Sequence, residues 1–385
     1  MSIYFDHAAT TPISDLALSA LTDAAKKLGN ASSLHSAGRS VRKELEAARE
    51  EIAATIDCAP SEVIFTGTGT EANNLAIKGL YWKATKSGKK IVITSTFEHH
   101  AVMDPILWLA EHEGAQIIQI DVDRNGVLNF DTLNKAIAEN REKIAFISIM
   151  HSNNEVGTVQ DIAQVVRLAG DIPVHSDCVQ SFCKVELSFK ELGLTAATIS
   201  AHKIGGPLGV AALILKKGLD IEPILHGGGQ ERDLRSGTFN APSILAFAAA
   251  AKESRSKLSQ RSVEVRKLKQ ELIQVVKEKV SDAWVNGNQT NTLPGIVSIT
   301  FPRSDSEGLL LLLDSEGIAC STGSACSAGV QRPSHVLLAM GLSEDETTST
   351  LRFSLSHSNT IAEIEKLGLV IASVVERSRA ASGKK

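Results

Sequence analysis

The strongest constraint on the fold is an alternation of short apolar runs with longer amphipathic segments between residues 63 and 215. The apolar runs have the length and composition of strands, whereas most of the segments between them have the apolar spacing of helices. Strands separated by helices form a largely parallel sheet that helices cover on both faces, which predicts an α/β fold. The predicted strands cover residues 63–65, 91–94, 116–120, 144–150, 172–175, 197–200 and 210–215.

A second, smaller domain is predicted beyond this alternation. A helical segment over 242–280 has an alanine-rich first half and a charged, amphipathic second half, and we interpret it as the bridge between domains. A chain of 385 residues is long enough for two domains. We therefore expect a large domain over 14–258 and a small α+β domain formed by 1–13 and 259–385. The small domain should contain strands over 295–301 and 350–355 and helices over 306–315 and 361–379.

Composition and charge exclude several classes of protein. An apolar content of 43%, a charged content of 22% and a net charge of −4 without a basic block are typical of soluble proteins that do not bind nucleic acid. The first residues lack the features of a signal or transit peptide, and the strongest apolar run, 309–313, is too short to span a membrane. Five cysteines without a CxxC pair argue against a disulfide framework and a structural zinc site. We therefore expect a cytoplasmic protein without a metal.

Polar residues follow several predicted strands, at the edge where open α/β sheets bind their ligands. The turn Gly67-Thr68-Gly69-Thr70 precedes a helix and offers backbone amides to a phosphate. The same turn fits a degenerate dinucleotide-binding motif with Glu98 as the ribose partner, and the motif alone does not decide between the two interpretations. His99 follows the next strand, where an imidazole can stack on an aromatic cofactor, shuttle a proton or simply begin a helix.

Asp177 and Lys203 follow two further strands. A carboxylate at a buried strand end either caps a helix or needs a cationic partner, such as a protonated pyridine nitrogen. Lys203 ends the sequence Ser200-Ala201-His202-Lys203, and a partly desolvated lysine there could attack a carbonyl as a neutral amine. Each residue alone also fits a structural role. Together, a phosphate-binding turn, a stacking histidine, a carboxylate and a lysine predict a site for pyridoxal 5'-phosphate, which Lys203 would bind as a Schiff base.

Two features of the predicted small domain point to further chemistry. The segment 320–329 has almost no side-chain bulk, so a cysteine on it could move to a substrate and attack as a thiolate; two semi-buried cysteines in a tight loop are the alternative. Arg352 lies in an apolar strand and needs a carboxylate partner, from a ligand or from an internal salt bridge.

The assembled pattern resembles the cysteine desulfurases of the NifS/IscS class, which belong to the fold-type-I aminotransferase superfamily. The resemblance runs from residues 4–12 to residues 352–355 and is most specific at Ser321-Thr322-Gly323-Ser324-Ala325-Cys326. The other matching blocks are 29–33, 70–74, 98–99, 151–157, 200–203 and 235–238. The sequence differs from the usual family residues at Thr68-Gly69 and at Gly205, and these differences remove none of the contacts that the resemblance implies.

The resemblance implies an enzyme that converts L-cysteine to L-alanine with pyridoxal phosphate and leaves the sulfur as a persulfide on Cys326. It implies that Lys203 binds the cofactor and moves protons, and that His99 stacks on the ring and acts as acid and base. The other implied contacts are Asp177 with the ring nitrogen, Gln180 with the ring hydroxyl, Gly69, Thr70, Ser200 and His202 with the phosphate, Thr238 with the phosphate of the neighbouring subunit, and Asn154 and Arg352 with the substrate carboxylate.

The resemblance also implies partners. Thr238 in that role requires a homodimer. The spacing from Cys326 to Pro333 resembles the longer loop of this class, which suggests sulfur delivery to an iron–sulfur scaffold or a tRNA-thiolation enzyme. A selenocysteine lyase or related lyase is the alternative on the same fold. A non-catalytic dinucleotide-binding or sulfur-scaffold protein is the alternative of another class.

Overall fold

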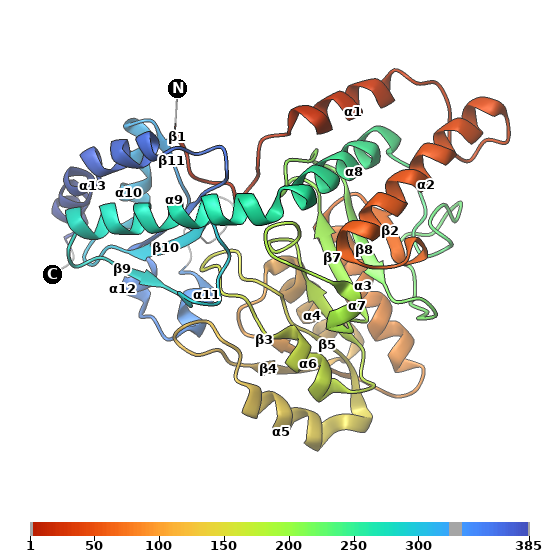
Figure 1. Cartoon of the computed structure of the whole chain (residues 1–385). Coiled ribbons are helices and arrows are strands. Elements are labelled where there is room, and N and C mark those ends of the chain that lie inside the picture. The colour runs from red at the N-terminus through yellow and green to blue at the C-terminus, as the bar shows by residue number, and fades with distance from the viewer. Residues whose placement is uncertain (1–2, 323–332, 384–385) are drawn as a thin grey trace.

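The computed structural model describes residues 3–322 and 333–383, and its largest feature is a seven-stranded sheet (Figure 1). The strands follow the order β2-β8-β7-β6-β5-β3-β4, and only β8 runs antiparallel to its neighbours in this sheet. All seven predicted strands are present, so the predicted α/β class with a mostly parallel sheet is confirmed. Their bounds are β2 Val63–Thr66, β3 Ile91–Ser95, β4 Gln116–Ile120, β5 Ile144–Ser148, β6 Val174–Asp177, β7 Ala196–Ser200 and β8 Ala211–Leu215.

Helices cover both faces of this sheet because successive strand residues point to opposite sides. In β2, Val63 and Phe65 join one hydrophobic cluster and Ile64 joins another. The Ile64 cluster includes α3 (Gly69–Thr85) and α4 (His100–Glu113). The opposite cluster includes residues of α1 Asp15–Ala25, α2 Ser36–Ile56, α5 Phe130–Asn140, α6 Ile162–Ala169, α7 Phe189–Leu192 and α8 Ala241–Ser256.

A three-stranded antiparallel sheet forms the second part of the molecule, next to a short parallel pair that includes the N-terminal strand (Figure 1). The sheet has the order β12-β10-β9 and shares a hydrophobic cluster with three helices. The buried residues of this cluster all come from residues 3–5 and 265–375, which supports the predicted division into 14–258 and 1–13 plus 259–385. One helix crosses this division, since α11 (His335–Ala339) packs its apolar side into the hydrophobic cluster of the large sheet. The division itself stays a prediction. The elements are β1 Ile3–Tyr4, α9 Leu258–Lys279, β9 Trp284–Asn286, β10 Ile296–Thr300, α10 Ser306–Ser315, β11 Ile318–Ala319, α11 His335–Ala339, α12 Glu344–Thr347, β12 Thr350–Ser354 and α13 Ile361–Ser382.

The prediction of one continuous helix over 242–280 is wrong. Lys257 leaves helical geometry, with φ −107° and ψ 6°, and separates α8 from α9. The Glu253 carboxylate stabilises the break, since it accepts hydrogen bonds from both Lys257 and Arg261.

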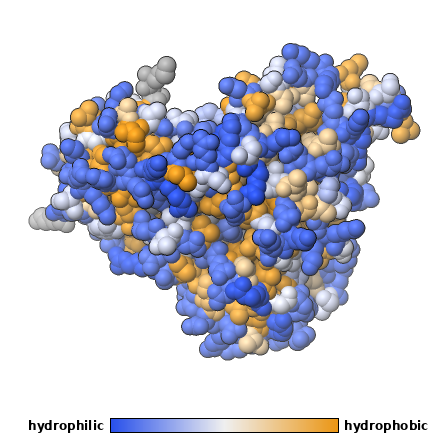
Figure 2. All heavy atoms as spheres, viewed as in Figure 1, coloured by the Kyte–Doolittle hydropathy of each residue, from blue (hydrophilic) through white to orange (hydrophobic). Residues whose placement is uncertain are grey.

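Figure 2 shows a mostly hydrophilic face with apolar residues gathered in separate patches. Within residues 3–322 and 333–383, no helix combines the length and the apolar character that crossing a membrane requires.

A buried ion pair anchors the long segment between β8 and α8, which carries Thr238. Arg49 on α2 is 3% exposed and Glu231 is 1% exposed. Two guanidinium nitrogens of Arg49 donate to the two carboxylate oxygens at 2.8 and 3.0 Å, and Arg49 also donates to the Val63 carbonyl at 2.8 Å. Because the pair is bidentate and dry, each charge depends on the other for its stability.

Arg49→Met should therefore lower the free energy of unfolding by about 3–5 kcal/mol, since it leaves the Glu231 carboxylate buried without a counter-charge. Denaturant unfolding measures this loss. Lys252→Met, which breaks the exposed Lys252–Glu51 pair, is the control and should change stability by less than about 1 kcal/mol. Equal losses in the two variants would contradict the assigned role of Arg49.

Candidate active site

A cavity of about 470 Å³ lies at the carboxyl ends of the parallel strands. The structure brings ten of the twelve predicted site residues to its wall: Gly69, Thr70, His99, Asn154, Asp177, Gln180, Ser200, His202, Lys203 and Arg352. Thr238 is exposed and does not line the cavity of its own chain. Cys326 lies outside the described residues. Ser321 and His335, on either side of that undescribed segment, both line the cavity.

Lys203 follows β7 and directs its amine to the N-terminal segment. The Nζ atom donates to the carbonyls of Ala8 and Ala9, each at 2.6 Å. Burial, together with the positive charge of Arg352, lowers the pKa of Lys203 to about 8 against the opposing effect of Asp6 and Asp177. About one amine in ten is then neutral at pH 7, so this lysine is suited to nucleophilic attack on a carbonyl.

Asp177 is the last residue of β6 and is buried. One carboxylate oxygen accepts from the Asn73 side chain at 2.7 Å, and the other accepts from the Val179 backbone amide at 2.9 Å. It does not cap a helix, and within the described part of the chain it forms no ion pair. A carboxylate has further acceptor capacity, so Asp177 can accept from a cationic group in the cavity.

His99 is the N-cap of α4, and its Nδ1 accepts from the Ala101 amide at 3.0 Å. Burial lowers the pKa of His99, although the charge of Asp177 opposes this shift. In the neutral ring the bond from Ala101 places the proton on Nε2. His99 therefore begins the helix and also lines the cavity, so its role as helix cap does not prevent contact with a ligand.

The glycine-containing turn after β2 presents its backbone to the cavity. Thr68 caps α3 by accepting from the Glu71 amide, and Gly69 and Thr70 form the first turn of the helix. A Cβ atom at Gly69 would lie 3.2 Å from Val179 Cγ2 and 3.8 Å from Ser200 Cβ, so glycine permits a close approach of the backbone here. Unpaired amides at the start of a helix form an anion site.

Glu98 is not available to a ribose, which removes the basis of the dinucleotide-binding alternative. Its side chain is 0% exposed and accepts from the Ser95 hydroxyl at 2.5 Å and from the Met150 amide at 2.9 Å. Burial raises the pKa of Glu98 to about 8. The residue therefore belongs to the interior of the protein.

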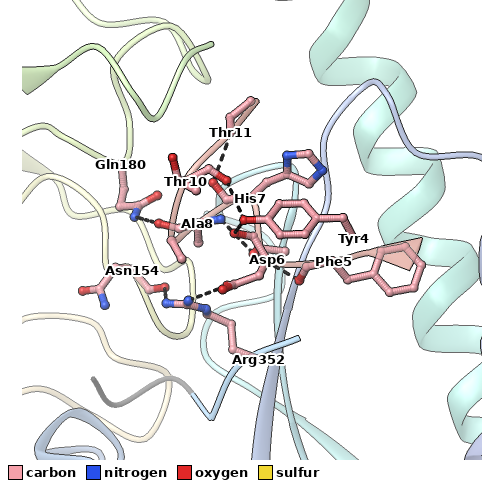
Figure 3. A network of polar contacts seen from close by, with 12 residues as sticks. Tyr4, Phe5, Asp6, His7, Ala8, Thr10, Thr11, Asn154, Gln180 and Arg352 are labelled. Atoms are coloured by element: carbon pink, nitrogen blue, oxygen red, sulfur yellow. Dashed lines mark hydrogen bonds and ion pairs between the residues drawn. The ribbon is translucent and has the colours of Figure 1, made fainter. Parts of the chain in front are cut away.

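Arg352 lies in β12 between Asp6 and Asn154 (Figure 3). Its guanidinium donates to the Asp6 carboxylate at 2.8 Å and to the Asn154 carbonyl at 3.0 Å. The internal salt bridge considered from the sequence is thus present. However, Arg352 Nε and Asn154 Oδ1 are buried without a hydrogen-bond partner among the described residues. A donor and an acceptor therefore remain unsatisfied at this end of the cavity.

The N-terminal segment forms one wall of the site, which the sequence pattern did not predict. Gln180 donates to the Ala8 carbonyl at 2.9 Å, and His202 Nδ1 lies 3.3 Å from the Thr10 hydroxyl (Figure 3 shows Gln180 beside Ala8). The only sequence signal for this wall was the match of residues 4–12 to the family pattern.

A buried carboxylate at the same edge was also missed. Glu155 accepts from the Ser334 hydroxyl at 2.5 Å, and burial raises the pKa of Glu155. The neighbouring His335 lies 2.9 Å from the Glu98 carbonyl oxygen through its Nε2. These contacts fix the chain directly after residues 323–332, at the wall of the cavity.

Comparison with known proteins agrees with this geometry. Residues 3–367 match the family described as aminotransferase class-V. The chain is 42% identical over 384 residues to an IscS-like cysteine desulfurase of Mycobacterium tuberculosis, covering 98% of each chain. A solved NifS-like protein superposes with a TM-score of 0.91 at 33% identity, over 98% of this chain and 100% of that one. A structure of SspA in complex with cysteine superposes with a TM-score of 0.79 at 32% identity, over 92% and 99%. The chain therefore belongs to the class-V aminotransferase family, and within it to the cysteine desulfurases of the NifS/IscS class.

Proposed function

We propose that this cysteine desulfurase works with pyridoxal 5'-phosphate held in the 470 Å³ cavity by Lys203. The observation that carries the proposal is the buried Asp177 carboxylate, which Asn73 holds at the wall that also carries the Lys203 amine. A pyridine nitrogen would supply the cation that Asp177 lacks among the described residues. The first amides of α3, with Ser200 and His202, would bind the phosphate, and Gln180 would contact the ring hydroxyl.

When bound, pyridoxal phosphate supplies an electron sink for charge that develops at the substrate α-carbon. The side chains of the protein bind the substrate and move its protons. Arg352, through its unsatisfied Nε, and Asn154, through its side-chain N–H groups, bind the substrate carboxylate. Lys203 and His99 hold and move protons at the α-carbon and its neighbour.

The sulfur step belongs to Cys326. Its thiolate forms a bond to the sulfur of L-cysteine, and the carbon–sulfur bond breaks with its electron pair remaining on carbon. That carbon takes up a proton and the product leaves as L-alanine, while Cys326 keeps the sulfur as a persulfide. A thiol or protein acceptor then removes the sulfur by exchange.

We further propose a cytoplasmic homodimer in which Thr238 contacts the phosphate in the neighbouring subunit. The exposure of Thr238 outside its own cavity supports this arrangement. The sulfur acceptor would be an iron–sulfur scaffold or a tRNA-thiolation enzyme, with no direct contact to nucleic acid.

The purified enzyme, loaded with pyridoxal phosphate, tests this function directly. With L-cysteine and a reductant it should release L-alanine and sulfide in equal amounts, and without a reductant it should accumulate protein-bound sulfur. Alanine and sulfide are measured in the same samples. A kcat/KM far higher for L-selenocysteine than for L-cysteine would favour the selenocysteine lyase instead.

Arg352→Lys should raise the KM for L-cysteine by about tenfold to a hundredfold, because a lysine cannot make the bidentate contact to a carboxylate. The kcat value should change much less, since the carboxylate does not react. Steady-state kinetics separate the two parameters. Arg379→Lys is the control, since Arg379 pairs with Asp282 away from the cavity. A fall in kcat with an unchanged KM would contradict the assignment.

A further inference from the structure

A second, smaller cavity lies behind Lys203. Its volume is about 90 Å³, and it shares only Ala8 and Lys203 with the larger cavity. Its other walls come mainly from the N-terminal segment, the turn at residues 183–184, the end of α8 with the start of α9, and residues 293–296 and 354–357. It therefore lies between Lys184 and Lys203 on one side and the small-sheet strands β10 and β12 on the other. We refer to it as the rear cavity.

The wall of the rear cavity carries basic side chains and no acidic ones. Five basic residues line it and no aspartate or glutamate does; the five are His7, Lys184, Lys203, Arg261 and His357. Lys184 donates only to the neutral Gln180 side chain, at 3.2 Å, and makes no ion pair within the described chain. Burial lowers the pKa of Lys184 to about 7, with added repulsion from Lys203 and Arg352. Arg261 does have a partner, Glu253, but Lys257 shares that carboxylate.

His7 supplies an independent sign of a missing ligand. It is 4% exposed, and neither ring nitrogen has a hydrogen-bond partner among the described residues; the Tyr4 backbone lies near the ring without completing one. Figure 3 shows the ring directed away from Asp6 and Arg352. Burial lowers the pKa of His7 to about 4, so the ring is neutral and offers one N–H. A buried, unsatisfied donor destabilises the protein unless an acceptor binds to it.

The size and chemistry of the rear cavity define its occupant. One water needs about 10–15 Å³ of such space, so the cavity can hold a group of several atoms. Water would satisfy hydrogen bonds but would not compensate the charge of protonated Lys184, which has no ion-pair partner among the described residues. Ser262 and Ser356 add further hydroxyl groups to the wall, whereas the hydroxyls of Thr11 and Ser254 already donate to the carbonyls of His7 and Ile204. The matching ligand is small, anionic and able to accept bonds in several directions.

We propose that the rear cavity binds a small tetrahedral oxyanion of the sulfate or phosphate type between His7, Lys184 and Arg261. This site is separate from the phosphate-binding turn at Gly69 and Thr70 in the larger cavity. The anion joins Lys184, in the predicted large domain, to His7 and Arg261, in the predicted small domain, so it stabilises the packing of one against the other.

Calorimetric titration of the cofactor-loaded enzyme with sodium sulfate tests the proposal, because the cofactor's own phosphate then fills the turn in the larger cavity. Sodium gluconate keeps the ionic strength constant, and sodium phosphate serves as the second probe. The expected result is one saturable site per chain and a higher thermal midpoint with either anion. Lys184→Met should weaken binding at least tenfold, whereas Lys190→Met, at a nearby exposed lysine, should leave it unchanged.

His7→Gln provides a second variant if Lys184→Met does not fold, since His7 makes no side-chain hydrogen bond that the substitution would break. It too should weaken sulfate binding by several-fold. Absence of saturable binding to the wild-type enzyme would overturn the proposal. So would equal affinities in Lys190→Met and in whichever cavity variant folds, because the binding site would then lie elsewhere.

Discussion

Lys203→Ala should lower cysteine desulfurase activity by about 10³-fold or more, because in the proposed function this lysine is both the covalent link to the cofactor and a proton-transfer group. The surroundings of Lys203 explain why its amine can react. Burial lowers the pKa of Lys203 to about 8, and two backbone carbonyls hold its amine at the cavity wall. Alanine formation from L-cysteine measures the loss. Borohydride reduction followed by peptide mass mapping measures the covalent link.

Lys216→Ala is the matched control, because Lys216 is exposed and does not line the cavity. It should retain both activity and the covalent link. Peptide mapping also distinguishes Lys203 from Lys184, whose amine is likewise buried and whose pKa is lowered to about 7. A reduced label that persists in Lys203→Ala would show that another lysine holds the cofactor.

The large sheet could be predicted from the sequence because its buried parallel strands are nearly continuous apolar runs. The break at Lys257 could not, because no glycine or proline marks it and the contacts of Glu253 stabilise it. The strand β9, Trp284–Asn286, was also missed. It has only three residues, and it is recognisable as a strand through its pairing with β10.

The candidate site was predictable where strand ends carry polar residues, as at Asp177 and Lys203. Its supporting contacts were not, since they join residues far apart in the chain. Asn73 lies 104 residues from the Asp177 that it contacts, and Asp6 lies 346 residues from Arg352. No local spacing encodes such pairs. The rear cavity was hidden for the same reason, because His7, Lys184 and Arg261 meet only in the folded chain.

Cys326 should be the cysteine on which sulfur transfer depends, because the other four thiols are poor nucleophiles. Burial raises the pKa of Cys58, Cys178 and Cys320 to about 12 in each case, and it also raises the pKa of Cys183. A thiol must ionise to attack, so these four have almost no reactive form at pH 7. The segment that carries Cys326 begins and ends at residues that line the cavity, Ser321 and His335.

Cys326→Ala should therefore lower sulfide release from L-cysteine by more than about 10³-fold and abolish the persulfide, while binding of the cofactor stays unchanged. Persulfide is measured by alkylation and mass spectrometry, and cofactor content by absorbance. Cys320→Ala, six residues upstream, is the matched control and should keep native activity, since its thiol is buried and its pKa is raised to about 12. Native sulfide release by Cys326→Ala would show that sulfur leaves the substrate without this nucleophile. Loss of activity in both variants would point instead to a structural requirement in the segment that joins β11 to α11.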